Sequence, residues 1–289
     1  MRFVVALAFS DLREYCEIAR VADECGYAYL AVSDHVVHPE TIRSPYPYSP
    51  DGAPRWQPEA PWADPWVAIG AMAGVTERIR FTTNIFVLAM RNPFLAAKAI
   101  ATAAEISGGR VSLGVGVGWM EDEFELLGQS FRDRGRRTDE LLGILPRLWS
   151  GGMVEHAGRD YAFPRLQMSP RVAAPIPVYV GGLSEPALRR AARHDGWISD
   201  LHTVDEVREL RARIEGHRRA QGTADRPFQL IAALSDAFDL DGYRRAAEAG
   251  VTHVMTQPWI FHGGPDASLD RKCDGLRRFA DDVLGPLGS

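Results

Sequence analysis

Short apolar runs alternate with helical segments along the whole chain, and this alternation restricts the possible folds more than any other feature. Phe3 to Phe9 is an unbroken apolar run typical of a buried parallel strand, and Asp11 with Glu14 predicts a capping box for a helix that ends at Gly26. A second strand, Tyr29 to Val32, follows directly. These segments predict a βαβ unit.

The same order repeats to the end of the chain. Further strands are predicted at Ile79 to Ile85, Val111 to Val115, Ile176 to Val180, Gly196 to Ile198, Phe228 to Leu234 and His253 to Met255. Helices are predicted at Pro65 to Val75, Pro93 to Ser107, Arg134 to Trp149, Glu185 to His194, Val204 to Gln221, Asp241 to Ala249 and Leu269 to Leu284. Eight strands at about 36 residues per unit favour an α/β fold with a TIM (β/α)8 barrel, formed as one domain by residues 1–289, over an open doubly wound sheet.

Two segments are longer than a minimal barrel requires. The stretch 33–64 contains seven prolines with Tyr46, Tyr48, Trp56 and Trp62, so it cannot be a regular helix. It leaves the carboxyl end of the second strand, where barrel active sites lie, and its aromatic rings could cover a flat ligand. A rigid surface loop or a dimer contact is the alternative. The stretch 151–177, between strands four and five, predicts a short hairpin insertion.

Composition excludes several classes of partner and location. The net charge is −5, so there is no basic field for nucleic acid. No window approaches the roughly 18 to 20 apolar residues that a membrane span needs. The three cysteines, Cys16, Cys25 and Cys273, form no CxxC pair, which suits a reducing compartment. We therefore expect a soluble cytoplasmic protein that acts on a small molecule, without nucleic acid or membrane partners.

The end of the fourth strand is rich in glycine. In Leu113 to Trp119, every second residue from Gly114 to Gly118 is a glycine, so backbone amides can approach a ligand closely. The segment is not a dinucleotide fingerprint, because Trp119 occupies the place of the third glycine. Glycines that simply make room for packed barrel side chains are the alternative.

The fifth strand runs into a second glycine turn, Gly181-Gly182-Leu183-Ser184. Ser184 can cap the helix that follows, and Pro186 suits the first turn of that helix. The free amides of such a turn can bind an anion, so a phosphate there is physically reasonable. An ordinary strand-to-helix turn is the alternative.

A cluster of polar side chains, Asp34, His35 and His38, stands at the exit of the second strand. A histidine at the mouth of a barrel can transfer protons near neutral pH, and His35 is the strongest candidate for a catalytic residue. A histidine that only hydrogen bonds within the long loop is the alternative. No HExxH motif occurs and no metal site is expected.

The combined motifs resemble the luciferase-like flavin and deazaflavin oxidoreductases, above all the branch that uses coenzyme F420. The resemblance runs from Phe3 to about Ile198 and is carried by Ser33 to Glu40, Arg91 to Pro93, Ile106 to Arg110, Leu113 to Trp119 with Glu123-Phe124, Arg134 to Glu140, Val180 to Gly182 and Gly196-Trp197.

This resemblance implies a deazaflavin ring in the barrel mouth, backed by a bulge with a non-proline cis peptide at Asn84-Ile85. It implies a phosphate and tail held by Gly116, Val117, Gly118, Trp119, Gly181, Gly182, Leu183 and Ser184, with arginines near the mouth. Asp34 and His35 would approach the ring and the substrate. The cofactor would move a hydride to or from an alcohol, ketone, imine or enone, while His35 orients substrate or shuttles a proton.

One departure from the family concerns the substrate. The sugar-phosphate dehydrogenases that the chain resembles carry a catalytic acid where this sequence has Trp119, which favours a larger, flatter and less polar substrate here. Glu121 and Glu123 are expected to be surface or capping residues. The resemblance also implies a homodimer, with the helices after strands two and three at the interface.

Three alternatives remain open. The first is an FMN-dependent monooxygenase that uses oxygen. The second is a metal-dependent hydrolase built on Asp34, His35 and His202. The third is a non-catalytic flavin-binding or dimer-partner protein.

Overall fold

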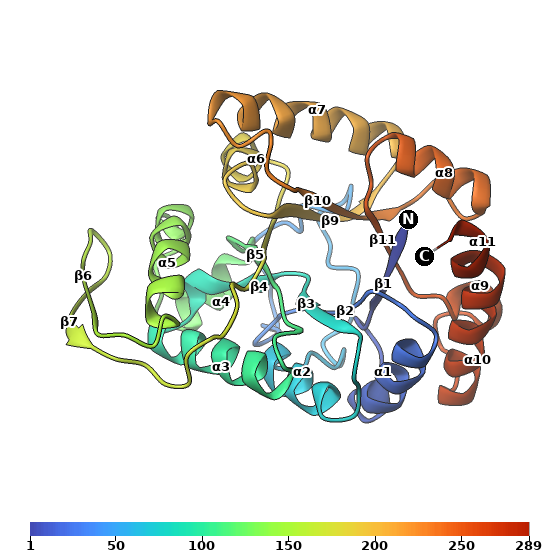
Figure 1. Cartoon of the computed structure of the whole chain (residues 1–289), viewed down its shortest axis with the longest axis horizontal. Helices are drawn as coiled ribbons and strands as arrows, with labels where there is room; N and C mark the ends of the chain where they lie inside the picture. The colour runs from blue at the N-terminus through green and yellow to red at the C-terminus, as the bar shows by residue number, and fades with distance from the viewer. Residues whose placement is uncertain (289) are drawn as a thin grey trace.

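The computed structural model describes residues 1–288, and its centre is a parallel sheet curled into a barrel (Figure 1). The strands run in the order β3-β2-β1-β11-β10-β9-β8-β5-β4. Their bounds are β1 Arg2–Ala6, β2 Tyr29–Val32, β3 Arg80–Thr83, β4 Phe86–Val87, β5 Leu113–Gly116, β8 Val178–Gly181, β9 Gly196–His202, β10 Gln229–Leu234 and β11 His253–Thr256. Each predicted strand lies at its expected place, and the predicted (β/α)8 barrel is confirmed.

One strand position of the barrel is occupied by two short strands, β3 and β4, and the barrel closes there. β3 pairs with β2, while β4, two residues further along, pairs with β5. An isolated parallel bridge from Phe81 to Val111 joins β3 to the residues just before β5. The Asn84-Ile85 peptide between β3 and β4 is cis, as predicted. β3 and β4 therefore count as one of eight strand positions, and the strand bulges at the rim of the barrel.

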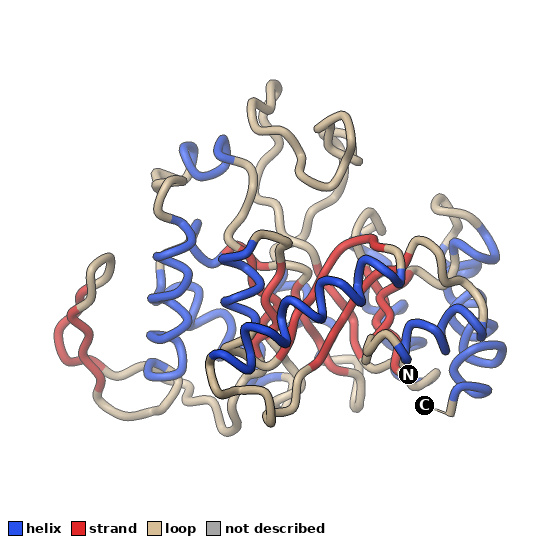
Figure 2. The backbone as a smooth tube through the Cα atoms, turned by 90° about the horizontal axis from the view of Figure 1, so that it is seen from above, coloured by secondary structure: helices blue, strands red, loops and turns tan. Residues whose placement is uncertain are grey.

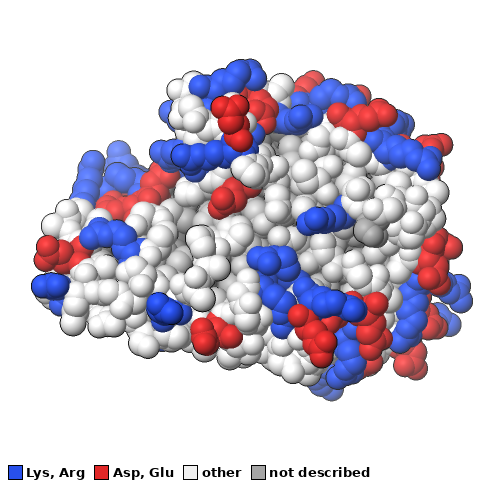
Figure 3. All heavy atoms as spheres, in the orientation of Figure 1, with Lys and Arg blue, Asp and Glu red and all other residues white. Residues whose placement is uncertain are grey.

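Helices cover the outside of the sheet, as Figure 1 shows. Their bounds are α1 Tyr15–Glu24, α2 Pro65–Ala73, α3 Pro93–Ile106, α4 Glu121–Leu126, α5 Arg134–Leu148, α6 Glu185–Ala191, α7 Val204–Ala220, α8 Leu240–Glu248, α9 Ile260–Gly263, α10 Leu269–Phe279 and α11 Gly285–Leu287. Short 3-10 turns lie at Leu12–Glu14 and Leu88–Met90, and a π-helical turn continues α10 over Ala280–Leu284. On the face drawn in Figure 3, side chains of both charges are interspersed over the outer helices.

The alternating strand residues divide the core into two parts. Outward side chains such as Phe3 and Val5 of β1 pack against the helices. Inward side chains form a smaller cluster inside the barrel: Val4, Tyr29, Ala31, Tyr179, Ile198, Ile231 and Met255. Full burial of one such aliphatic side chain is worth about 1.5–3 kcal/mol. The barrel interior is therefore packed, and a large cavity lies above it, at the carboxyl ends of the strands.

Two local predictions are corrected by the structure. Asp11 caps the short 3-10 turn rather than a long helix, and α1 begins at Tyr15. Glu14 does not complete a capping box, because its carboxylate binds Lys272 of α10 at 2.5 Å. That contact joins segments 258 residues apart, so local spacing could not predict it.

Both predicted insertions are present. Residues 33–64 contain no helix or strand, and Figure 2 shows long loops rising from the end of the barrel opposite the N-terminus. The second insertion is an antiparallel hairpin of β6, Val154–Ala157, and β7, Ala162–Leu166. It stands away from the barrel beside α5 (Figures 1 and 2). None of the helices in residues 1–288 has the length and apolarity to cross a membrane.

Candidate functional site

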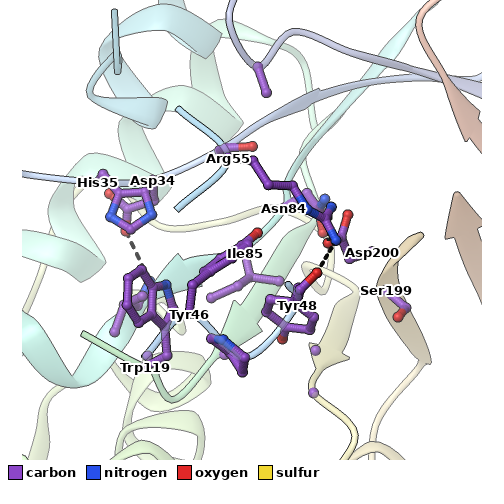
Figure 4. Close-up of a pocket in the computed structure, with 18 of the residues that line it drawn as sticks. Asp34, His35, Tyr46, Tyr48, Arg55, Asn84, Ile85, Trp119, Ser199 and Asp200 are labelled. Atoms are coloured by element: carbon purple, nitrogen blue, oxygen red, sulfur yellow. Dashed lines mark hydrogen bonds and ion pairs between the residues drawn. The ribbon is translucent and has the colours of Figure 1, made fainter. Parts of the chain in front are cut away.

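A cavity of about 950 Å³ opens at the carboxyl ends of the strands. All the residues predicted for the site line it: Asp34, His35, Asn84, Ile85, Gly116, Val117, Gly118, Trp119, Gly181, Gly182, Leu183 and Ser184. Figure 4 shows Ile85 near the middle of the view, with Asp34 and His35 on one side and Ser199 and Asp200 on the other. The structure therefore brings the candidates from four strand ends into one place.

The aromatic side chains of the 33–64 loop form a cover over this cavity. The ring of His35 lies 4.8 Å from Trp56 and 4.9 Å from Trp62, between centroids. Tyr46 contacts both Trp56, at 5.2 Å, and Trp119 of the β5–α4 turn, at 5.1 Å. The two contacts of Tyr46 are edge-to-face, and each stabilises the cover by about 0.5–1.5 kcal/mol. The loop lines the cavity, as expected from its aromatic content.

An ion pair ties this cover to the far side of the barrel. Arg55 in the loop binds Asp200 of β9 at 2.8 Å and also donates to the carbonyl of Tyr48. The guanidinium lies 5.6 Å from the ring of Tyr46. The dashed lines of Figure 4 mark this connection. The 33–64 loop is thus held across the mouth at a residue 145 positions away in the sequence.

His35 is held by a buried carboxylate that the sequence analysis placed at the surface. Nδ1 of His35 lies 3.1 Å from Oε2 of Glu123, whose side chain is only 3% exposed. Oε1 of Glu123 accepts from the amides of Val36, at 2.6 Å, and Val37, at 3.3 Å. Burial tends to raise the pKa of Glu123, but the bonds from His35 and the two amides outweigh burial and hold the pKa below its ordinary value.

The prediction for Glu123 was therefore wrong, whereas Glu121 is exposed as expected. Since an ionised Glu123 only accepts hydrogen bonds, it selects the His35 tautomer with a proton on Nδ1. Nε2 then remains available as a proton acceptor. The Glu123-Phe124 pair was one of the motifs of the family resemblance, and Phe124 is fully buried next to Glu123. The Glu123-Phe124 motif was therefore the sequence signal that could have identified Glu123 as a residue of the site.

Asp34 precedes His35 in the sequence, but its carboxylate binds other residues. Its Oδ1 binds Arg91 at 2.5 Å, and its Oδ2 accepts from the amide of Val87 at 3.0 Å. Burial raises the pKa of Asp34, and Arg91 opposes that rise. Arg91 in turn lies over the ring of Phe86, 4.4 Å from its centroid. Asp34 thus joins the exit of β2 to β4 and fixes the backbone from which His35 projects.

Ile85 explains two of the cavity glycines. A Cβ at Gly116 would lie 2.4 Å from Cδ1 of Ile85, and a Cβ at Gly181 would lie 2.8 Å from Cγ2 of the same side chain. Both glycines therefore make room for Ile85, which is the packing role that the sequence left open. Gly118 differs, because its φ is +81° and a side chain there would be strained. Ile85 forms an apolar floor between β5 and β8.

Arg134 is the cavity arginine whose charge is not neutralised. Its Nε donates to the carbonyl of Gly118 at 3.0 Å, its Nη1 donates to that of Phe131, and it packs 3.5 Å from the Phe131 ring. Among residues 1–288, no carboxylate lies within 4 Å of it, whereas Arg43 and Arg55 are both paired with acids. Burial lowers the pKa of Arg134. The site therefore offers one available cation next to the β5 glycine turn.

Ser184 is the N-cap residue of α6, as predicted, but its side chain makes no capping hydrogen bond. Ser184 lines the cavity. The Gly181 to Ser184 turn is braced from below, since Nε1 of Trp197 donates to the carbonyl of Gly182 at 3.0 Å. Both predicted glycine turns thus border the same space as Arg134.

Sequence reasoning missed the β9 side of the cavity. Ser199 and Leu201 pair with consecutive residues of β10, so Asp200 is the extra residue of a β-bulge. This bulge brings Ser199, Asp200 and Leu201 together into the cavity lining. The rim on this side is apolar and exposed, formed by Leu201, Phe238, Ile260 and Phe261. Two adjacent polar residues at a strand end were the only available signal.

The histidines proposed for a metal hydrolase do not converge. His35 contacts Glu123, Asp34 contacts Arg91, and His202 contacts Ser199. Nδ1 of His38 has no hydrogen-bond partner. Within residues 1–288, no group of three or more His, Cys, Asp or Glu side chains has a metal-binding arrangement. The metal-hydrolase alternative therefore lacks the ligand set that it required.

Several known proteins are similar to this chain in sequence. The family model for luciferase-like monooxygenases matches residues 3–262. An uncharacterized protein of Mycobacterium tuberculosis (strain H37Rv) is 36% identical over 289 residues, which cover 99% of this chain and 100% of that protein. An F420-dependent glucose-6-phosphate dehydrogenase of Nakamurella multipartita is 30% identical over 242 residues, covering 80% of this chain and 65% of that enzyme.

A solved structure supports the fold. An F420-dependent secondary alcohol dehydrogenase, in complex with an F420–acetone adduct, superimposes with a TM-score of 0.76 at 17% identity and covers 98% of this chain and 99% of that one. At this identity the likeness establishes the architecture alone. With a family model that matches residues 3–262 and relatives that are 30% and 36% identical, the chain belongs to the luciferase-like monooxygenase family.

Proposed function

We propose that this chain is an oxidoreductase that uses coenzyme F420 to move a hydride to or from an organic substrate. The observation that carries the proposal is the arrangement around Ile85. An apolar floor suited to a flat ring, the His35–Glu123 pair and the available Arg134 line one cavity. The F420-dependent names of a 30% identical relative and of a structural neighbour support the choice of cofactor.

The residues present fit a flat ring with an anionic tail. Ile85 would support the ring, with the backbone of Asn84 beside it. Arg134, with the turns Gly116 to Trp119 and Gly181 to Ser184, would hold the phosphate, because an unpaired guanidinium favours an anion. When bound, the deazaflavin supplies the hydride donor or acceptor.

His35 is the proposed proton carrier. In the direction of alcohol oxidation, its Nε2 accepts the hydroxyl proton, and the resulting imidazolium is stabilised by Glu123 at 3.1 Å. In the reverse direction, the imidazolium returns the proton to the carbonyl oxygen. Asp34 is a positioning residue, because both of its oxygens are occupied by Arg91 and Val87. The aromatic cover of the 33–64 loop excludes water from the reacting groups.

The proposed substrate is an alcohol or ketone, an imine or an enone, with a substantial apolar part. Trp119 stands where sugar-phosphate dehydrogenases of the family carry an acid, and the β9–β11 rim is apolar. We also propose a cytoplasmic homodimer joined through α2 and α3, on which Val67 and Leu95 are 73% and 71% exposed.

The first experiment is a parallel titration of the protein with F420 and with FMN, followed by tryptophan fluorescence. Trp119 lines the cavity, so a bound ring is expected to quench it, and Trp119→Phe serves as the control for the other six tryptophans. Tight binding of F420 and weak binding of FMN supports the proposal. The family model keeps a second candidate in view, a monooxygenase that uses reduced FMN and oxygen. Preference for FMN would replace the first proposal with the second.

Turnover is tested next with F420 under both air and nitrogen. A bound deazaflavin reacts poorly with oxygen, so the rate of F420 reduction by a panel of secondary alcohols is expected to be the same in both. A requirement for oxygen would contradict the deazaflavin proposal.

A further inference from the structure

A second polar chain borders the cavity, on the side opposite His35 (Figure 4). Oγ of Ser199 lies 2.7 Å from Nε2 of His202. Nδ1 of the same imidazole lies 3.6 Å from Oε2 of Glu206, which is one turn along at the start of α7. Hydroxyl, imidazole and carboxylate therefore follow one another in a line, and of the three residues Ser199 alone lines the cavity.

The three groups differ in their access to water. Ser199 is 5% exposed and His202 is 9% exposed, whereas the Glu206 side chain is 59% exposed. The chain thus begins in the cavity and ends in solvent. The His35–Glu123 pair has no such exit, because both side chains are largely buried and Glu123 is bound by backbone amides. That pair can hold a proton next to the substrate but has no exposed group through which to pass it on.

The local structure holds the line in place. The bulge at Asp200 sets the direction of Ser199, and His202 stacks on Trp197 with an interplanar angle of 26°. The amide of Ser235 donates to the carbonyl of His202 at 2.9 Å. Glu206 also forms the capping box of α7 with Thr203. A hydrogen bond from the Thr203 amide keeps the pKa of Glu206 low, so its carboxylate remains ionised beside the imidazole.

The geometry points to Ser199, His202 and Glu206 as a proton relay between the covered cavity and solvent. When neutral His202 carries its proton on Nδ1, Ser199 accepts a proton from a bound ligand and passes its own proton to Nε2. The imidazolium is held by Glu206 and releases its Nδ1 proton to water. In the reverse direction, neutral His202 carries its proton on Nε2, takes up a proton from water at Nδ1 and delivers the Nε2 proton through Ser199 to the ligand. One proton crosses, no electrons move, and Ser199 and Glu206 return to their starting forms, while His202 changes tautomer and regains its first tautomer by proton exchange with water.

The assignment of a purpose to the relay rests on the proposed oxidoreductase function, because hydride transfer to or from an alcohol or carbonyl requires one proton to leave or enter. The relay itself can be tested without any turnover. In residues 1–288, Glu206 is the only carboxylate within ion-pair distance of His202. Its effect on the imidazole can therefore be measured in isolation.

The first test is NMR of the full chain with labelled histidine, titrated from pH 5 to 9, with His202→Gln used to assign the signal. Glu206→Gln is expected to shift the Nδ1 signal of His202, because it removes the charged neighbour of that nitrogen. Filling the cavity with F420, or with FMN if only FMN binds, is expected to shift the His202 signal, although His202 does not line the cavity. Ser199→Ala is expected to abolish that response.

His217 is the matched control, because it also pairs with a carboxylate, Glu185 at 2.8 Å, but lies outside the cavity lining. Its signal should not respond to the cavity ligand. A His202 Nδ1 signal unchanged by Glu206→Gln would overturn the contact with Glu206 and with it the link to solvent. A ligand response that persists in Ser199→Ala would overturn the link to the cavity. If neither cofactor binds, the proposed function fails, and the effect of Glu206→Gln on the free protein still decides the solvent link.

The second test is kinetic and uses F420 with whichever alcohol proves active. Ser199→Ala and His202→Gln are each expected to lower the rate of F420 reduction by about 100-fold, in the range for general acid–base groups. The double variant should be no slower than the slower single variant, because members of one relay are not additive. The Kd for F420 should stay within twofold. His217→Gln should retain the full rate. If the rate losses of the two single variants multiply in the double variant, or if the Kd for F420 rises as much as the rate falls, these residues have a purely structural role. Either result would refute the relay.

Discussion

Glu123→Gln removes the negative charge that holds His35 and barely changes the size of the side chain. Glu123 accepts three hydrogen bonds, one from His35 and two from the amides of Val36 and Val37. Glutamine keeps an oxygen for the amides, but its NH2 group faces Nδ1 of His35, which must then change tautomer. Hydrogen bonds to a charged group contribute about 1.5–3 kcal/mol, against about 1 kcal/mol for neutral ones. The free energy of unfolding at pH 7 is therefore expected to fall by about 2–3 kcal/mol.

The sign of the pH dependence follows from the pKa of Glu123, which is lower in the folded protein than its ordinary value of 4.5. The unfolded chain therefore binds this proton first as the pH falls. The stabilisation from the carboxylate is complete above the ordinary value and is lost as the pH falls through the folded value. The deficit of the glutamine variant should persist at pH 5 and shrink below it.

The assay is urea unfolding of both proteins at pH 7, 5 and 4. Glu121→Gln is the matched control, since Glu121 is exposed two residues away, and it should change the free energy of unfolding by less than about 0.5 kcal/mol. A deficit that does not depend on pH, or one no larger than that of the control, would refute the assignment of Glu123 as an ionised partner of His35. Activity provides an independent check, because the variant should also lose its proton carrier.

Three further predictions concern the glycines, the cavity cation and the oligomer. Gly181→Ala places a methyl group 2.8 Å from its nearest neighbour, so thermal unfolding should reveal a loss of about 1–3 kcal/mol, whereas Gly143→Ala, with open space around it, should not destabilise the protein. Arg134→Ala should weaken F420 binding by about 10- to 100-fold in a fluorescence titration, while Arg136→Ala, whose guanidinium is already paired with acids, should have little effect. Val67→Glu should convert the proposed dimer to a monomer in light scattering, and an unchanged mass would exclude α2 from the interface.

The order of strands and helices could be predicted because it depends on local patterns. Short apolar runs of three to seven residues, several of them next to glycine turns, appear where the barrel needs a strand buried on both faces. The predicted helix from Leu269 to Leu284 is continuous in the structure, but its last turn is π-helical. Pattern reasoning has no signal for that change, since the hydrogen-bond register depends on how the helix end packs.

The polar contacts of the site could not be predicted in the same way. Asp34 and Arg91 are 57 residues apart, and His35 and Glu123 are 88 apart, so no spacing rule connects them. Motif reasoning placed Asp34 and His35 correctly at the mouth but assigned both the same kind of role. The fold separates them, because only His35 keeps a nitrogen that is not used by a neighbour. The acidic residues at the start of α4 have the pattern of an ordinary exposed helix. The fold shows that the long loop covers Glu123.

The pairing of β1 also has a consequence for synthesis of the chain. β1 lies between β2 and β11, with Arg2 opposite His253. β1 is the first strand of the barrel to be made, and its second neighbour, β11, is the last. Until then, one edge of β1 presents unpaired amides and carbonyls that can bind other nascent chains. Truncation before β11 should therefore yield aggregating rather than partly active protein, and the barrel should close only after β11 has left the exit tunnel.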